Sequence, residues 1–242
     1  MRGRVILAAA TFTQLAAGTV APAEQDEALW TRLRGGGQVV MIRHAATEPG
    51  VGDPPGFRLD DCATQRNLSP AGREEARRLG AAFRARQVPI RRVLSSRWCR
   101  CLETAHLAFG TVEPWPPLDS FFGDRSREQT QTEAVRALIA QPPDGGNLIL
   151  VTHQVNITAV TGLHASPGEI IVISPTGSDT VRVAGRLTPR PSSYGGFKFL
   201  AQQGGHETPR SVCASATPFS WAIPGYRCCA RNLNSGTYFP LA

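Results

Sequence analysis

Apolar and polar residues along the chain follow two patterns, one typical of buried strands and one typical of amphipathic helices. Short apolar runs bounded by turn-forming residues predict strands, and apolar residues three or four positions apart predict helices. Because strands and helices alternate, the chain is expected to adopt an α/β fold, a three-layer α/β/α arrangement with a mainly parallel central sheet. The predicted strands cover 38–42, 93–95, 147–152, 170–173 and 181–187, the last two as a pair, and the predicted helices cover 27–34, 99–109 and 127–140, with two more beginning at Ser69-Pro70 and after His153.

Two of these predicted strands end abruptly on a histidine. The first apolar run ends at Arg43 and His44, and the run 147–152 is followed by His153. In open α/β sheets, ligands bind just beyond the carboxyl ends of the strands. Each histidine alone would more readily be interpreted as a satisfied core residue, but their matched placement favours a shared site. Arg43 beside His44 suits that site to an anion.

A long polar segment, 48–67, follows the first strand and contains several glycines and prolines. Loops of this length within a compact domain are typically either binding loops or disordered segments. The sequence leaves both alternatives open.

Length and composition fit one soluble globular domain, since the chain has 242 residues of which 41% are hydrophobic. The net charge of +7 is concentrated at the two ends: two positive charges belong to residues 1–23 and four to residues 188–242, which leaves only one for 24–187. No basic face is therefore expected on the domain, and nucleic acid is not an expected partner.

The N-terminus has the pattern of a secretory signal peptide, predicted for residues 1–23. A basic start is followed by the mostly apolar stretch 5–20 and the small residues Ala21-Pro22-Ala23. A short amphipathic helix or an uncleaved anchor is the alternative. We therefore expect a periplasmic or secreted protein with no stable membrane anchor after signal cleavage. The Gly/Ser/Pro-rich residues 188–242 are expected to form a poorly ordered extension of the domain at 24–187.

Six cysteines complete the composition. In an oxidising compartment, Cys62 can pair with Cys99 or with Cys101, and sequence alone does not decide between them. The spacing does not match the usual zinc-ligand pattern, so no metal and no other cofactor is expected. A zinc-dependent hydrolase using the two histidines and cysteines is the competing hypothesis. The remaining cysteines, all in the C-terminal extension, are Cys213, Cys228 and Cys229.

Four segments, in order along the chain, carry a family resemblance. Residues 42–47 (Ile-Arg-His-Ala-Ala-Thr) are similar to an R-H-G-x-[ST] signature, 68–72 begin the helix that follows it, 95–105 are similar to S-x-x-x-R-x-x-x-T-A, and 151–153 end on the second histidine. Together they resemble the histidine phosphatase superfamily over about 36–187. The resemblance implies a phosphoglycerate-mutase-like fold and a bacterial, exported member of the non-acid-phosphatase branch.

This resemblance also implies roles for individual residues. His44 would be the nucleophile that forms a phosphohistidine, and His153 would stabilise charge in the transition state. Arg43 and Arg100 would bind the phosphate, because guanidinium groups match its charge and geometry. Thr47 would donate one further hydrogen bond to it.

A leaving oxygen needs a proton, so a carboxylic acid is expected near the phosphate. The family places this acid between the second strand region and the last histidine. Asp124 follows Phe121-Phe122-Gly123 in a loop and is the first choice, with Glu128 the second; either could instead be a first-turn acid stabilised by a helix dipole. The other carboxylates of this stretch are Asp119 and Glu133.

Two departures from the family pattern bear on function. Ala45 replaces the usual glycine, which could crowd the phosphate, and Gln154 follows His153, so the pattern of the acid-phosphatase and phytase branch is absent. The predicted function is a metal-independent phosphomonoester hydrolase acting on a small or cell-envelope phosphorylated substrate. The alternatives are a non-catalytic phosphate-binding pseudoenzyme and a phosphoglycerate-mutase-type phosphotransferase.

Overall fold

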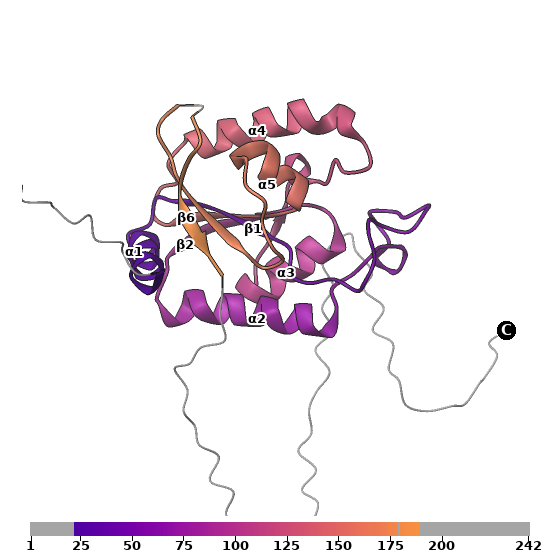
Figure 1. Ribbon diagram of the computed structural model, residues 1–242, viewed down its shortest axis with the longest axis horizontal. Helices are drawn as coiled ribbons and strands as arrows, with labels where there is room; N and C mark the ends of the chain where they lie inside the picture. Colours follow the sequence, from indigo (N-terminus) through magenta and orange to yellow (C-terminus); the bar gives the residue numbers. More distant parts are fainter. Residues whose placement is uncertain (1–21, 179, 189–242) are drawn as a thin grey trace, which may run out of the picture.

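A six-stranded sheet lies between two layers of helices in the computed structural model, which describes residues 22–178 and 180–188 (Figure 1). The predicted signal peptide up to residue 21, and the predicted extension beyond residue 188, lie outside the described residues. The strands, in the spatial order β3-β2-β4-β1-β5-β6, are β1 (Val39–Arg43), β2 (Ile90–Ser95), β3 (Glu113–Pro114), β4 (Asn147–Thr152), β5 (Ile170–Ser174) and β6 (Arg182–Leu187). The helices are α1 (Pro22–Arg34), α2 (Pro70–Ala85), α3 (Cys99–Phe109), α4 (Glu128–Ala140) and α5 (Gln154–Thr161), with short 3-10 turns η1 (Cys62–Thr64), η2 (Pro116–Leu118) and η3 (Arg125–Arg127).

The sheet is mainly parallel, as the sequence predicts. Strands β1, β2, β3 and β4 run in one direction, whereas β5 runs antiparallel to β1 and β6 antiparallel to β5. The three-layer α/β/α class is therefore confirmed, with an antiparallel pair at one edge.

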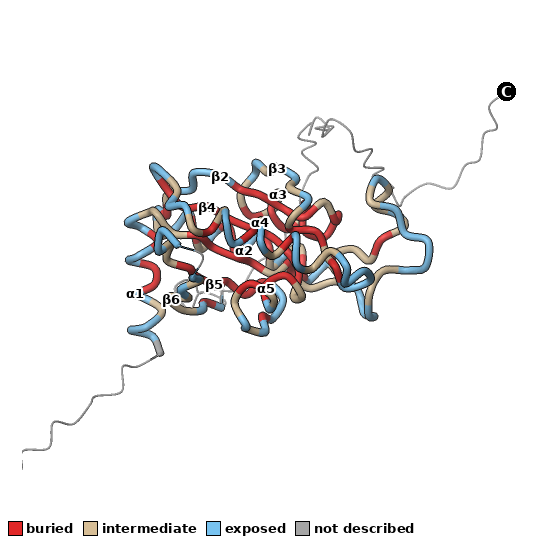
Figure 2. Tube along the Cα trace, turned by 90° about the horizontal axis from the view of Figure 1, so that it is seen from above, coloured by how far each residue is buried: buried red, intermediate tan, exposed pale blue. Residues whose placement is uncertain are grey.

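Each face of the sheet has its own core. In β1, Val40 and Ile42 pack with α1, α2 and α3, whereas Val39 and Met41 pack with α4 and α5. Side chains of a strand point alternately to opposite faces, so covering both faces requires an unbroken apolar run. Figure 2 shows this arrangement as buried strands inside a more exposed outer layer.

The element bounds differ from the prediction mostly at polar ends. Helix α1 begins at Pro22 rather than at 27, and β2 begins at Ile90 rather than at 93. The first three side chains of β2 are exposed, so no apolar pattern marks them, yet their backbone still pairs with β4. Among the described residues, no helix is both long enough and apolar enough to cross a membrane.

Strand register brings the two histidines to one edge of the sheet. In the parallel pair of β1 and β4, Arg43 lies opposite Thr152. His44 and His153 each follow one residue later, and the backbone N–H of His44 donates to the carbonyl of Thr152 at 3.0 Å. The carboxyl edge of the sheet is thus where the functional site is built.

Helix α2 supports the segment that follows His44. Its N-cap is Ser69, whose Oγ accepts from the Gly72 N–H at 3.0 Å, as the Ser-Pro start of the helix predicts. A Cβ built on Gly72 would lie 1.8 Å from the carbonyl oxygen of Ala46. Only glycine therefore lets α2 approach this segment so closely.

Candidate active site

His44 and His153 lie side by side, with ring centroids 5.4 Å apart in an edge-on arrangement. Both side chains are buried, and both line one pocket at the carboxyl edge of the sheet. The structure thus brings together the two histidines that the sequence singled out from strands more than a hundred residues apart.

The surroundings of His44 fix its charge and its tautomer. Burial, reinforced by the positive charge of Arg100, lowers the pKa of His44 to about 3, so the ring is neutral at neutral pH. Its Nδ1 lies 2.9 Å from the carbonyl oxygen of Ala45, which can only accept, so Nδ1 carries the proton. The other nitrogen, Nε2, is then unprotonated and has no hydrogen-bond partner among the described residues, as a nucleophile requires.

His153 is held more tightly by the protein. Its Nε2 lies 2.8 Å from the hydroxyl of Ser96, and the thiol of Cys101 lies 3.4 Å from the same nitrogen. The indole of Trp98 packs edge-on against its ring at 5.3 Å. Burial, followed by the charge of Arg100, lowers the pKa of His153 well below its ordinary value. This histidine is therefore also neutral, with its orientation set by its neighbours.

Three arginines give the inner wall of the pocket its positive character. Arg43 and Arg100 were predicted from the sequence, and Arg66, from the loop 48–67, joins them. Burial and mutual repulsion lower the pKa of both Arg43 and Arg66. In all three side chains the Nε atom is buried without a hydrogen-bond partner among the described residues. All three side chains line the pocket and carry like charge, so this cluster is suited to an anion.

Arg100 is held by a carboxylate that no sequence motif marks. Asp53 accepts from Nη1 and Nη2 of Arg100 at 2.7 and 3.1 Å, and from the indole N–H of Trp98 at 2.9 Å. Burial raises the pKa of Asp53, but the hydrogen bond and charge of Arg100, with further donors, lower it below its ordinary value. Asp53 is therefore a carboxylate anion on the guanidinium expected to bind phosphate. Glu103, three residues after Arg100 in the same helix, pairs with Arg73 at 2.6 Å and not with Arg100.

A disulfide joins the loop 48–67 to α3. It links Cys62 to Cys99, which is one of the two pairings that the sequence left open. Cys99 is the first residue of α3, so the bond fixes the loop beside Arg100. Cys101 keeps a free thiol, and its burial raises its pKa to about 12. The long loop is thus an ordered part of the site and not a disordered insertion.

The other predicted residues lie in different places. Asp124 lines the pocket at its exposed rim, where the hydroxyl and N–H of Ser126 lower its pKa. Glu128 does not line the pocket and pairs with Arg125 at 2.9 Å. Thr47 forms an isolated bridge with Leu68 and also lies outside the pocket. The structure therefore brings Asp124 to the site but not Thr47 or Glu128.

Ala45 does not line the pocket. It is fully buried in a small apolar cluster with Leu68 and Ala76. The departure from glycine at this position therefore leaves the pocket uncrowded.

The pocket has a volume of about 750 Å³, within the range of small-molecule sites. Its inner wall holds the histidines and arginines described above. The outer wall is formed by the loop 48–67, by the segment between η2 and η3, and by the start of α5. The residues of the outer wall include Val51, Phe57, Ser120, Phe122, Asp124, Arg127 and Gln154.

Among the described residues, no three His, Cys, Asp or Glu side chains gather as a metal site. Cys62 and Cys99 are bonded to each other and cannot serve as thiolate ligands. The zinc hypothesis therefore loses two of the cysteines that it needs.

The chain is similar to phosphatases of known structure and to one family of proteins. Residues 39–121 match the histidine phosphatase superfamily (branch 1), a segment that includes His44 and Arg100 and ends before His153. The solved structure of the protein histidine phosphatase SixA, in complex with tungstate, is 17% identical over 63% of this chain and 97% of that chain, with a TM-score of 0.47. A mycobacterial glucosyl-3-phosphoglycerate phosphatase, in complex with VO3, is 18% identical over 60% of this chain and 95% of that chain, with a TM-score of 0.46. The comparison with curated proteins gave no match.

Proposed function

We propose, from the membership of this chain in the histidine phosphatase superfamily, that this phosphatase hydrolyses phosphomonoesters through a phosphohistidine on His44. The observation that carries the proposal is the neutral His44, with Nδ1 bound to a carbonyl and Nε2 free, in a pocket with three buried arginine Nε donors that have no partner among the described residues. A phosphomonoester dianion supplies the negative charge that these three arginines lack.

In the first step, Nε2 of His44 attacks phosphorus, and the bond between phosphorus and the leaving oxygen breaks. The Nδ1–H of His44 remains bound to the Ala45 carbonyl, which stabilises the positive charge that the ring acquires. Arg43, Arg66 and Arg100 stabilise the negative charge of the phosphoryl oxygens during the transfer. In the second step, water attacks phosphorus, the bond to nitrogen breaks, and inorganic phosphate leaves.

Asp124 is the candidate proton donor in this scheme. It gives its proton to the leaving oxygen in the first step and takes one from the attacking water in the second, so protons balance over a turnover. Among the described residues it makes no ion pair, in contrast to the pocket carboxylate Asp53. Ser126 lowers the pKa of Asp124, whereas the negative charge of a bound phosphoryl group acts in the opposite direction.

The first experiment tests the nucleophile. The purified protein, in EDTA, is expected to hydrolyse para-nitrophenyl phosphate and to form an acid-labile, base-stable phosphoenzyme with labelled substrate. His44→Ala is expected to abolish the phosphoenzyme and lower the rate by at least about 10³-fold. Unchanged activity in this variant would exclude His44, and stoichiometric zinc with activity lost in EDTA would favour the metal hypothesis.

A second experiment tests the proton donor by changing the leaving group. Nitrophenolate can leave without a proton, whereas an alkoxide must be protonated as it leaves. Because kcat/KM reports formation of the phosphoenzyme and not its hydrolysis, Asp124→Asn should leave kcat/KM for para-nitrophenyl phosphate nearly unchanged. It should lower kcat/KM for an alkyl phosphate by about 10²–10⁴-fold. Glu128→Gln is the matched control and should lower neither rate. Equal effects of Asp124→Asn on both substrates would contradict the assignment.

We also propose that the enzyme acts outside the cytoplasm, on a small or cell-envelope phosphate. The signal-like N-terminus supports this, and so does the Cys62–Cys99 disulfide, because such bonds persist in oxidising compartments. Expression of the full chain in a Gram-negative host should give a periplasmic protein that begins near Glu24. A cytosolic protein that retains Met1 would contradict this location.

A further inference from the structure

Three exposed apolar side chains surround the mouth of the pocket. Among the described residues, four large hydrophobic side chains are exposed, and three of them, Val51, Phe57 and Phe122, line this pocket. Val51 is 89% exposed and Phe122 is 58% exposed, so water covers apolar surface that could otherwise be buried. The fourth, Ile90, lies at the start of β2, away from the carboxyl edge of the sheet. Clustered exposed apolar groups usually mark a binding surface.

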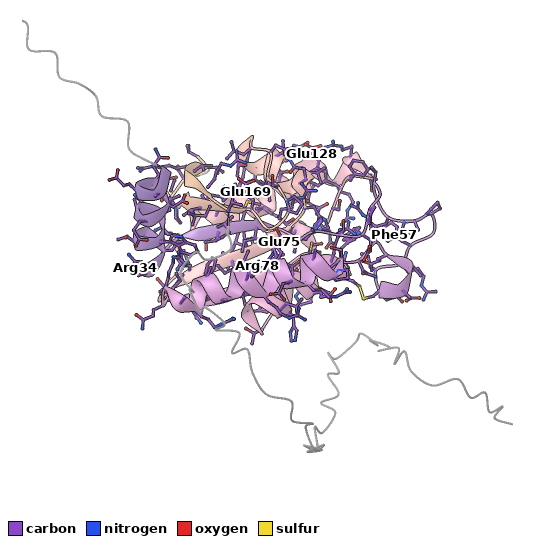
Figure 3. All side chains as sticks on the ribbon, turned by 60° about the horizontal axis from the view of Figure 1, so that its bottom comes forward. Arg34, Phe57, Glu75, Arg78, Glu128 and Glu169 are labelled. Carbon is purple, nitrogen blue, oxygen red and sulfur yellow. A yellow bond between two sulfur atoms is a disulfide. The ribbon has the colours of Figure 1, made fainter. Side chains whose placement is uncertain are left out.

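These side chains come from two loops that meet over the pocket. Val51 and Phe57 belong to the loop 48–67, and Phe122 belongs to the segment between η2 and η3. A Cβ on Gly52 would lie 3.9 Å from the Phe122 ring, so the two loops are in contact. Phe57 packs against Trp98 with ring centroids 5.7 Å apart. Figure 3 shows Phe57 at the end of the molecule opposite Arg34, so the apolar mouth lies at that end.

Apart from Asp124, which is assigned to the leaving oxygen, the polar side chains of the outer wall have partners within the protein. Arg127 pairs with Asp119 at 3.7 Å. The hydroxyl of Ser120 accepts from the Phe122 N–H at 3.3 Å. The amide of Gln154 donates to Thr158 at 2.6 Å and accepts from the Ala165 N–H at 3.0 Å. A substrate rich in hydroxyl groups would thus find few free partners here, whereas a hydrocarbon group would find uncovered apolar surface.

We propose that the substrate is a phosphomonoester whose leaving group is a hydrocarbon chain. This inference rests on the proposed function and specifies its substrate class. The phosphate binds among the arginines at the inner wall, and the chain lies across Val51, Phe57 and Phe122 toward solvent. The pocket volume of about 750 Å³ leaves room for both parts. Burial of these three side chains and of the chain is the source of the selectivity.

The experiment measures kcat/KM for n-alkyl phosphates from ethyl to octyl, each below its micelle concentration, with glycerol phosphate as the polar reference. The value is expected to rise by about two- to fourfold per methylene, the upper limit set by complete transfer of a methylene from water. The rise should level off once the chain extends beyond the apolar mouth. Hexyl phosphate should exceed glycerol phosphate by at least about tenfold.

Variants locate the effect on the protein. Phe122→Ser and Phe57→Ser should each reduce the ratio of the hexyl to the ethyl value, measured within the same variant. Ile90→Ser removes the exposed apolar side chain away from the pocket and should keep the wild-type ratio. A ratio that does not change in the two Phe variants would overturn the proposal, as would a flat chain-length series in the wild-type enzyme.

Binding of alkylphosphonates, which cannot be hydrolysed, separates this inference from the proposed function. Their Kd values should fall with chain length even if no turnover occurs, and Phe122→Ser should weaken the trend. Hydrolysis of every ester at one rate, with Kd values independent of length, overturns the apolar leaving group but leaves the phosphatase intact. Absence of turnover and of a phosphoenzyme on every ester overturns the proposed function.

Discussion

Asp53→Asn is the substitution that tests most directly how Arg100 is used. The carboxylate and the guanidinium form a nearly dehydrated pair, since Arg100 is 5% and Asp53 8% exposed at the side chain. Phosphate can reach the two Nη atoms of Arg100 only by displacing Asp53 or by binding beside a like charge. The asparagine keeps the shape and one acceptor but loses the charge.

Hydrogen bonds to charged groups contribute about 1.5–3 kcal/mol, against about 0.5–1.5 kcal/mol for neutral ones. With two such bonds at 2.7 and 3.1 Å, the substitution should lower the free energy of unfolding by about 2–3 kcal/mol. In the variant, this free energy no longer opposes the binding of phosphate to Arg100. The Kd of phosphate should therefore fall by up to about 30- to 150-fold. Stability and affinity are thus expected to change in opposite directions.

The assay combines denaturant unfolding with calorimetric titration of inorganic phosphate or vanadate. Added phosphate should restore stability in the variant more than in the wild type, as linkage requires. Asp61→Asn is the matched control, because Asp61 lies in the same loop and pairs with the exposed Arg58. An unchanged or weaker phosphate Kd in Asp53→Asn would refute the reasoning and make Asp53 a structural clamp alone.

Three further predictions follow from the structure. Because the folded pKa of His44 is about 3, below pH 6.5 this histidine gains its proton only in the unfolded state. The contribution of His44 to stability should therefore fall by up to about 2 kcal/mol between pH 6.5 and 5, and urea melts of His44→Gln should lack this component while keeping that of His153. Reduction of the bond between Cys62 and Cys99, which are 37 positions apart, should lower the free energy of unfolding by about 4 kcal/mol and weaken phosphate binding, whereas oxidant should restore both. Gly72→Ala and Gly80→Ala both place a Cβ within 2.0 Å of a carbonyl oxygen, so both variants should destabilise α2. Only Gly72→Ala should also displace the segment after His44 and reduce kcat. Equal kcat values in the two variants would contradict the role of Gly72.

The sequence predicts the framework of this site well, because strand ends follow local rules. The apolar run that becomes β4 and the helix that ends before Gly110 have the predicted bounds. His44 and His153 could be placed together since parallel strands deliver their carboxyl ends to one edge. The two-residue strand β3 was not predicted, because it ends on Pro114 and has no apolar pattern.

The loop 48–67 could not be predicted in the same way, because its order comes from distant contacts. Asp53 and Arg66 have no periodic pattern around them, and their places depend on Arg100 and on the disulfide to Cys99. The one available signal was Cys62, which predicts a disulfide from this loop to Cys99 or Cys101 but does not decide between them. In this chain the disulfide is thus the only sequence signal that connects the loop 48–67 to the site.

Charge explains why a carboxylate was the residue most difficult to foresee. A search for an anion site looks for cations, yet Arg43, Arg66 and Arg100 repel one another while burial also penalises their charges. A cluster of this kind needs an anion in order to fold before any substrate is present. Asp53 supplies that anion on the same loop as Arg66. If Arg100 binds phosphate as proposed, the residue that lets the site form is also the one that competes with the substrate, and Asp53→Asn shifts this balance.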